Sequence, residues 1–219
     1  MSKRTFALII AAAGEGRRLG ENTAKAFVDL DGMPMLLRTL ARFDGIPRIT
    51  ETVIAVRPGD VERAHACLAG REVTVVEGGS RRQESVRAAL SAATAEYVAV
   101  HDAARPFVTR DLIEQILDEA VENGAAIAAI AVTDTIKQAD GGRIVRTVPR
   151  EDLWAAQTPQ AFATDILRRA FESTAGSATA TDDAQLVEAL GVPVRIVAAG
   201  PENFKITMPE DLARARALF

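Results

Sequence analysis

Residues 6–20 read FALIIAAAGEGRRLG, an apolar run that passes directly into a glycine-rich turn carrying two arginines. An apolar run bounded by glycine is typical of a strand that is buried on both faces. Lys3 and Arg4 before the run also resemble the start of a short signal peptide, but the charged turn follows the apolar residues at once. We therefore interpret residues 6–12 as a buried first strand.

Strand-like runs and helical patterns alternate along the rest of the chain. We expect further strands at residues 52–56, 73–76, 97–101, 126–132 and 192–197. Helical spacing of apolar residues occurs around 35–43, 61–68, 84–93, 112–121, 164–172, 182–190 and 209–218. This alternation predicts an α/β fold, Rossmann-like, with a mostly parallel sheet and helices on both faces.

Residues 134–157 interrupt the alternation because they show no helical period. Two β-rich stretches flank the glycine turn Asp140-Gly141-Gly142, which predicts a β-hairpin. An inserted hairpin either folds over the active site or reaches a second subunit, and the residues alone leave both open. We expect one domain over residues 1–219, with this hairpin as an arm.

Composition limits the partners and the compartment. The net charge of −4 argues against nucleic acid, and no apolar stretch approaches the ~20 residues that span a membrane. Cys67 is the only cysteine, so no disulfide forms within the chain, which fits a reducing compartment. We therefore expect a cytoplasmic protein that binds neither nucleic acid nor membrane.

Ligands of open parallel sheets bind beyond the carboxyl ends of the strands, so the loops after strands are informative. The first, residues 11–20, matches neither a dinucleotide fingerprint, which needs glycine at Leu19, nor a Walker loop, since Glu21 follows Gly20. What remains is a glycine turn with Arg17 and Arg18, followed by Lys25. Glycine amides and nearby cations suit a triphosphate, although a plain surface turn gives the same letters.

Two more loops carry candidate site residues. In the loop at 77–85, Gly78 and Gly79 permit close contact with a base, while Ser85 either caps a helix or hydrogen-bonds the base. The loop at 101–106 begins with His101 and Asp102, a carboxylate at a strand end that suits Mg²⁺ held jointly with substrate phosphates. Arg105 of the same loop suits an anionic substrate, and His101 is expected to be a hydrogen-bonding support.

No nucleophile–base pair stands out, since there is no GxSxG motif and the two histidines lie in unrelated contexts. A substrate phosphate oxygen that is already ionised at neutral pH needs no general base to attack. Positioning and charge stabilisation are then sufficient to carry the rate.

Taken in order, six motifs resemble one enzyme family, the 2-C-methyl-D-erythritol 4-phosphate cytidylyltransferases of the non-mevalonate isoprenoid pathway. The motifs are AAGEGRRL at 12–19, GG at 78–79 with Ser85, HDAARP at 101–106, TPQ at 158–160, TDD at 181–183 and KITMPEDL at 205–212. The resemblance covers essentially the whole chain. It implies a fold of the nucleotide-diphospho-sugar transferase type, and transfer of CMP from CTP to methylerythritol phosphate with Mg²⁺, releasing pyrophosphate.

The resemblance also implies a role for individual residues. Arg18 and Lys25 match cations that stabilise the transition state, Arg150 and Lys205 match residues that position the polyol phosphate, and Asp102 matches the Mg²⁺ ligand. The implied nucleotide-binding residues are Ala12, Ala13, Gly14, Gly16, Gly79 and Ser85. The further substrate-binding candidates are Arg105, Thr135, Thr158 and Asp182. The hairpin resembles the family's dimerisation arm, so the resemblance implies a homodimer.

Three residues depart from the family pattern. Proline often precedes Ala-Ala-Gly in the family, where this chain has Ala11, and the lysine often stands in Pro-Lys-Gln, where Lys25 lies between Ala24 and Ala26.

Alternatives to the methylerythritol enzyme are a ribitol-5-phosphate cytidylyltransferase making CDP-ribitol, a nucleotidyltransferase for another sugar and base, and a non-catalytic nucleotide-binding module. The joint presence of Arg18, Lys25 and Asp102 argues against the last.

Overall fold

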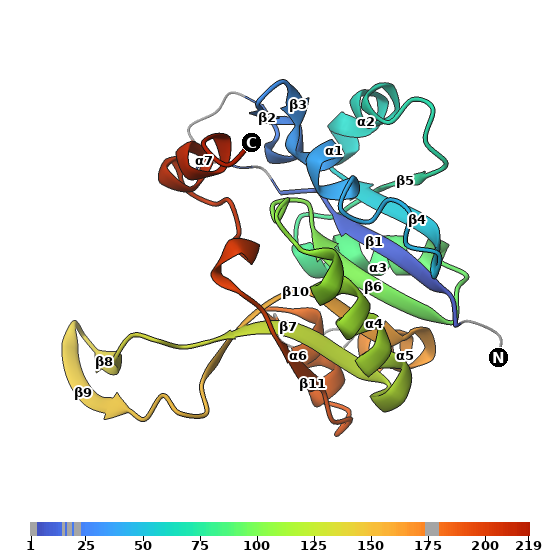
Figure 1. Ribbon diagram of the computed structural model, residues 1–219. Coiled ribbons are helices and arrows are strands. Elements are labelled where there is room, and N and C mark those ends of the chain that lie inside the picture. Colours follow the sequence, from blue (N-terminus) through green and yellow to red (C-terminus); the bar gives the residue numbers. More distant parts are fainter. Residues whose placement is uncertain (1–3, 15, 17–18, 20–22, 174–179) are drawn as a thin grey trace.

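The protein is built on a seven-stranded sheet. Its computed structural model describes residues 4–14, 16, 19, 23–173 and 180–219. The strand order is β11-β7-β10-β6-β1-β4-β5 (Figure 1). The strands are β1 (Phe6–Ala11), β4 (Ile49–Val56), β5 (Thr74–Glu77), β6 (Tyr97–Asp102), β7 (Ala125–Ala131), β10 (Trp154–Ala163) and β11 (Arg195–Ala198). Strand β10 is antiparallel to both neighbours and all other pairs are parallel, which confirms the predicted mostly parallel sheet.

Of the seven strands of the central sheet, β10 is the one that the sequence pattern does not predict. The segment expected to belong to the hairpin reaches residue 157, but Trp154 already pairs with Ala131 of β7. Pro159 lies within the strand, and the register shifts between Ala156 and Gln160. These features break the regular alternation by which a strand is recognised in a sequence.

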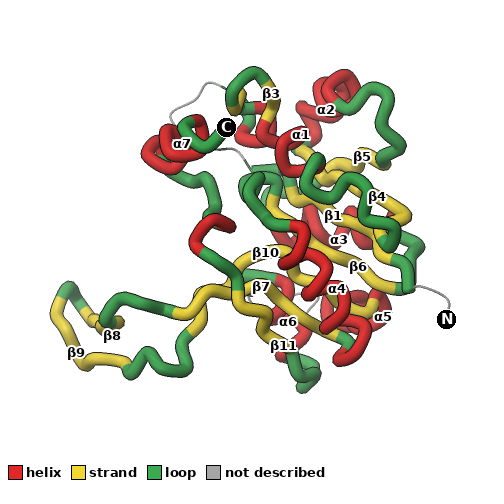
Figure 2. The backbone as a smooth tube through the Cα atoms, in the orientation of Figure 1, coloured by secondary structure: helices red, strands yellow, loops and turns green. Residues whose placement is uncertain are grey.

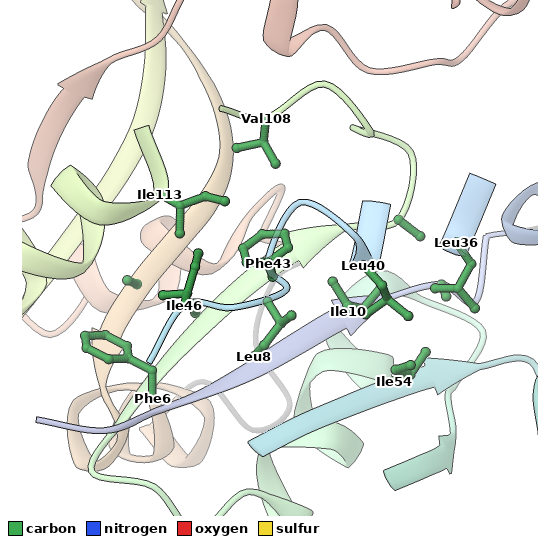
Figure 3. Close-up of a cluster of buried hydrophobic side chains, with 14 of the residues drawn as sticks. Phe6, Leu8, Ile10, Leu36, Leu40, Phe43, Ile46, Ile54, Val108 and Ile113 are labelled. Carbon is green, nitrogen blue, oxygen red and sulfur yellow. The ribbon is translucent and has the colours of Figure 1, made fainter. Parts of the chain in front are cut away.

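Helices cover both faces of the sheet, as predicted. Leu8 and Ile10 of β1 belong to one apolar core, and Ala7 and Ile9 belong to the other, because successive side chains of a strand point to opposite faces. Helices α1 (Met35–Leu40), α2 (Val61–Cys67) and α4 (Arg110–Asn123) pack on the first face, and α3 (Arg82–Ala92), α5 (Thr164–Ser173) and α6 (Asp183–Glu188) on the second (Figure 2). Figure 3 shows the first core, where Leu8 and Ile10 lie beneath Leu40 and Phe43.

A third apolar cluster holds the C-terminal segment against the rest of the chain. Leu212 and Ala215 of α7 (Pro209–Arg216) pack with Leu30, which lies in the small hairpin of β2 (Asp29–Leu30) and β3 (Met33–Pro34). The ring of Phe219 stacks on Phe107 with centroids 4.8 Å apart. This packing holds the α7 end of the segment that runs from β11 to α7. None of the helices in the described part of the chain is long and apolar enough to cross a membrane.

The predicted hairpin is present as β8 (Ile136–Asp140) and β9 (Arg143–Val148), which form a separate two-stranded sheet. Gly141 and Gly142 connect the strands with φ values of 52° and 77°, the left-handed conformation that a tight hairpin turn requires. The hairpin extends away from the central sheet (Figure 1). Ile144 and Val145 are 67% and 61% exposed there, so the arm carries apolar side chains that this single chain does not cover.

Candidate active site

A cavity of about 430 Å³ lies at the carboxyl ends of β1, β5 and β6, where the sequence predicts a ligand site. These strands run parallel, so the loops that follow them meet at one edge of the sheet. The predicted site residues that line the cavity are Ala12, Ala13, Gly14, Gly16, Lys25, Gly79, Ser85, Asp102 and Lys205. Arg18, predicted to be catalytic, lies outside the described residues.

Gly16 brings the first loop against Lys25. Its φ is +73°, and a Cβ atom added there would lie 2.9 Å from the Cβ of Lys25. Any side chain would therefore strain the backbone and displace the lysine. Gly16 therefore determines how closely the backbone approaches Lys25.

The second loop closes on the first through a pair of glycines. A Cβ atom on Gly78 would lie 2.6 Å from Ser85 Oγ and 2.9 Å from Ala13 Cβ. The amide of Gly79 donates to Ser85 Oγ at 3.2 Å, and that hydroxyl lies 3.3 Å from the carbonyl oxygen of Arg81. Ser85 thus holds the loop on the first turn of α3, and the same residue lines the cavity.

The start of α3 is also fixed by Glu84. Its carboxylate accepts hydrogen bonds from the Arg81 amide at 3.1 Å and the Ser80 hydroxyl at 3.0 Å. These bonds, with that from the Arg81 side chain, lower the pKa of Glu84 to about 2. The loop that carries Gly79 is therefore tied to the helix by an ionised carboxylate at any pH near neutral.

Asp102 is surrounded by three cations. Its Oδ2 lies 2.8 Å from Lys205 Nζ and 3.7 Å from Arg105 Nε, and its Oδ1 lies 3.1 Å from Arg82 Nε. Burial by itself raises the pKa of this carboxyl, but the charges of Arg82, Lys205 and Arg105 outweigh it and hold the pKa well below its usual range. Asp102 is therefore ionised at the edge of the cavity.

Arg82 connects Asp102 to a second carboxylate that sequence reasoning missed. Its Nη1 donates to Asp183 Oδ2 at 2.7 Å, and Asp183 is fully buried. Burial would lower the pKa of Arg82, but the charges of Asp183 and Asp102 raise it, so the guanidinium stays charged. Burial raises the pKa of Asp183, an effect that the charge of Arg82 opposes. The TDD motif at 181–183 was the available signal, but it led to Asp182.

His101 supports Asp102 from behind, as the sequence suggests. The Thr158 hydroxyl accepts a hydrogen bond from the Asp102 amide at 3.0 Å and lies 3.1 Å from His101 Nδ1. On the other side of the ring, His101 Nε2 lies 3.1 Å from the Arg105 carbonyl oxygen. Complete burial lowers the pKa of His101 to about 4. A neutral ring with its proton on Nε2 satisfies all three bonds.

Two predicted substrate ligands lie in this supporting layer and do not line the cavity in this structure. Thr158 is 4% exposed and is engaged with Asp102 and His101. Arg105 is 8% exposed and donates from Nη1 to the carbonyl oxygen of Asn203 at 2.7 Å. Direct contact of either residue with a substrate therefore stays a prediction.

The remaining predicted residues lie further out. Asp182 is the N-cap of α6, where its Oδ1 accepts from the Gln185 amide at 3.0 Å. Thr135 and Arg150 are exposed at the base of the arm, where Arg150 donates to the carbonyl oxygen of Thr133. None of these three residues lines the cavity of this chain. Thr207, which the sequence reasoning did not select, does line it.

The donor set for a metal ion is small. The described residues include no group of three or more histidine, cysteine or carboxylate side chains that could hold an ion. Asp102 is a single ionised carboxylate beside the cavity. That set fits Mg²⁺, which is commonly held by one or two carboxylates together with substrate phosphates.

Comparisons with known proteins point to one family. Residues 6–219 match the family model described as IspD, 2-C-methyl-D-erythritol 4-phosphate cytidylyltransferase. A protein of that name from Symbiobacterium thermophilum is 46% identical over 217 residues, covering 96% of this chain and 91% of the relative. The crystal structure of the enzyme from Thermus thermophilus superposes with a TM-score of 0.85 at 40% identity and covers 98% of both chains.

Proposed function

The chain belongs to the 2-C-methyl-D-erythritol 4-phosphate cytidylyltransferase family, and we propose that the cavity beyond β1, β5 and β6 is its active site. The enzyme transfers CMP from CTP to 2-C-methyl-D-erythritol 4-phosphate in the isoprenoid pathway. The products are 4-diphosphocytidyl-2-C-methyl-D-erythritol and pyrophosphate. One observation carries the proposal: Lys25, Asp102 and Lys205 line the same cavity as two glycine loops.

CTP binds between the two glycine loops in this proposal. The cytidine lies against Ala12, Ala13, Gly79 and Ser85, whose small side chains leave room for a planar base. The triphosphate follows the turn that contains Gly14 and Gly16, where backbone amides cradle phosphate oxygens. The close approach of Gly78 to Ala13 and Ser85 supports this arrangement, because it holds both loops at a fixed separation.

The transfer step requires charge stabilisation and little proton transfer. A phosphate oxygen of methylerythritol phosphate attacks the α-phosphorus of CTP in line, and the bond from the α-phosphorus to the bridging oxygen of pyrophosphate breaks. Lys25, with Arg18, neutralises the charge that develops on the phosphate oxygens. The buried, neutral His101 is occupied with Thr158 and Arg105, so it supports the site and does not act as a base.

Asp102 is the residue that would hold Mg²⁺ in this site. When bound, the ion would neutralise and orient the triphosphate, with Asp102 as its protein ligand. The low pKa of Asp102 keeps this carboxylate ionised and ready to bind. Lys205, which is 39% exposed in its side chain, is the partner of Asp102 best able to turn toward a substrate phosphate.

The arm makes the enzyme a homodimer in this proposal. The exposed Ile144 and Val145 provide an apolar surface for a second subunit. Arg150 and Thr135 at the base of the arm then reach the polyol phosphate in the partner's cavity, which explains why they lie away from the cavity of their own chain. Arg105, Thr158 and Asp182 contribute to the substrate-binding side of the cavity in their own chain.

We also assign the enzyme to the cytoplasm. Cys67 is its only cysteine and is half-buried, so the fold uses no disulfide within the chain. Such use of cysteine is ordinary in a reducing compartment.

A substrate panel tests the proposed function. Pyrophosphate release is followed with CTP and Mg²⁺ while methylerythritol phosphate and ribitol 5-phosphate are offered separately, and UTP replaces CTP in a parallel series. We expect release only with CTP and methylerythritol phosphate together. Release only with ribitol 5-phosphate, or with neither polyol phosphate, would contradict the assignment.

A further inference from the structure

The two carboxylate oxygens of Asp102 have different partners. Oδ1 is held by Arg82 at 3.1 Å, whereas Oδ2 faces Lys205 at 2.8 Å and Arg105 at 3.7 Å. Arg82 and Asp102 are 20 residues apart, and the bond between them connects the first turn of α3 to the end of β6. The orientation of the carboxylate therefore depends on a side chain from the second loop.

Arg82 is itself held by a carboxylate that the fold places in advance. Asp183 begins α6, and Gln160 of β10 fixes the backbone around it. Gln160 Oε1 accepts from the Ala184 amide at 3.1 Å, and Gln160 Nε2 donates to Asp182 Oδ2 at 2.9 Å. The anchor of Arg82 is thus bonded to the central sheet, and neither Asp183 nor Gln160 lines the cavity.

Lys205 is held less firmly than Arg82. Its side chain is 39% exposed, compared with 26% for Arg82 and 10% for Arg105. Within the described residues, Lys205 makes no ion pair other than that with Asp102, whereas Arg82 also bonds Asp183 and Arg105 also bonds the Asn203 carbonyl. Of the three cations, Lys205 is the one that can leave with the smallest loss of contacts.

We infer that Arg82, anchored by Asp183, is a positioning residue that holds Oδ1 of Asp102 and keeps Oδ2 available at the cavity for a divalent cation. When the cation arrives with CTP, Lys205 moves from Oδ2 to a substrate phosphate while Arg82 stays. This inference rests on the proposed role of Asp102 as the metal ligand. It deepens that role by naming the pair of residues that orients the ligand.

The chemistry of arginine suits this task. The planar guanidinium donates to two carboxylates at once through nitrogens at fixed angles, whereas a lysine is a point charge on a flexible stem. The Arg82–Asp183 pair is also neutral as a whole, so it orients Asp102 while leaving the local charge of the site nearly unchanged. Loss of groups that orient a metal ligand typically costs about 10-fold to 100-fold in metal affinity or activity.

Two variants test the inference without changing the local charge. Arg82→Lys keeps the positive charge but loses the planar guanidinium that bonds two carboxylates at once. The double variant Arg82→Met/Asp183→Asn removes the ion pair, so no buried carboxylate is left without its partner. For each variant, calorimetry gives the Kd of CTP with and without Mg²⁺, in the absence of the polyol substrate. The Mg²⁺ concentration for half-maximal pyrophosphate release and the melting temperature are measured in parallel.

We expect both variants to need about 10-fold to 100-fold more Mg²⁺ and to lose most of the increase in CTP affinity that Mg²⁺ gives the wild type. The Kd of CTP without Mg²⁺ should change little. The double variant should melt close to the wild type, so the metal defect would be separate from stability. An unchanged Mg²⁺ requirement in both variants, or a lower melting temperature with a normal requirement, would overturn the inference.

A matched control is Arg48→Lys. Arg48 also bridges two carboxylates, Glu114 at 3.0 Å and Asp118 at 2.7 Å. It lies at the amino end of β1, at the opposite end of the strand from the cavity, where its carbonyl oxygen accepts a hydrogen bond from the Phe6 amide. This variant should keep the wild-type Mg²⁺ requirement. Asp102→Asn separates the two proposals. If Asp102→Asn leaves the Mg²⁺ response intact, the metal role of Asp102 fails. If Asp102→Asn changes the response and the Arg82 variants leave it intact, only the positioning role fails.

Discussion

Lys25 shows at the scale of single residues how backbone geometry positions a charge. The left-handed Gly16 lies directly against it, and a Cβ atom at residue 16 would come within 2.9 Å of the lysine Cβ. The lysine is thus placed at the cavity by a residue without a side chain. A cation fixed in this way before substrate binds loses little energy to reorganisation in the transition state.

Replacing Lys25 should therefore affect the transition state more than the bound ground state. We expect Lys25→Ala to lower kcat by about 10²-fold to 10³-fold, the usual effect of removing one charge-stabilising donor. The Kd of CTP should rise far less, and Lys25→Arg should recover part of the rate because it keeps the charge. Equal losses in rate and in CTP affinity would remove Lys25 from that role.

His101 links the site to stability through its proton. Its folded pKa of about 4 lies below the ordinary value of 6.5, so the folded protein binds fewer protons than the unfolded chain between those values. Lowering the pH from 6.5 to 4 therefore favours unfolding. The loss amounts to roughly 3 kcal/mol at the low end of that range.

The matching measurement is the free energy of unfolding by urea at several pH values from 4 to 7, for the wild type and for His101→Gln. The raised pKa of Asp183 has the opposite effect on stability, because it favours the folded state as the pH falls. Asp183 is present in both proteins, so the difference between their stability curves isolates the contribution of His101. We expect the wild type to lose more stability than the variant as the pH falls. Parallel curves would show that the folded protein does not exclude the proton from His101.

At the scale of elements, regular patterns were predictable and irregular ones were not. Strand β1 and helix α4 follow simple periods, and their positions agree with the prediction within one or two residues. Strand β10 has a proline and a register shift, and it joins the sheet only by pairing with β6 and β7. Its existence depends on long-range pairing, which a local pattern does not contain.

The arm gives a prediction at the same scale. Ile144→Asp puts a charge on its exposed apolar surface, and we expect the homodimer to dissociate, which sedimentation at micromolar concentration would detect as a halved mass. Ile196→Asp is the control, because Ile196 is a similarly apolar residue, 45% exposed, on β11 outside the arm. A wild-type protein that sediments as a monomer, or equal effects of both substitutions, would contradict the assignment of the arm.

At the scale of the whole molecule, the sheet gathers residues that are far apart in the chain. Lys25, Asp102 and Lys205 come from three separate segments of the chain, yet all line one cavity. The rule that ligands bind at the carboxyl ends of parallel strands was enough to select the first two. Lys205 was selected by family resemblance, since the residues around it carry no local signal of an active site.

The Arg82–Asp183 pair marks the limit of what the sequence could predict. The two residues are 101 positions apart, and their contact depends on where α3 and α6 pack against the second face of the sheet. Arg82 follows the motif Gly78-Gly79, and Asp183 is the last residue of TDD. A charged side chain in or beside a motif has no signature until the fold shows which partner it contacts.

The most direct test of the active-site assignment is a crystal structure of the protein with CTP and Mg²⁺. We predict the cytosine against Gly79 and Ser85, the triphosphate between the first loop and Lys25, and the metal ion bound to Asp102, with Lys205 turned away from that carboxylate. A nucleotide bound elsewhere, or a metal ion held without Asp102, would contradict this assignment.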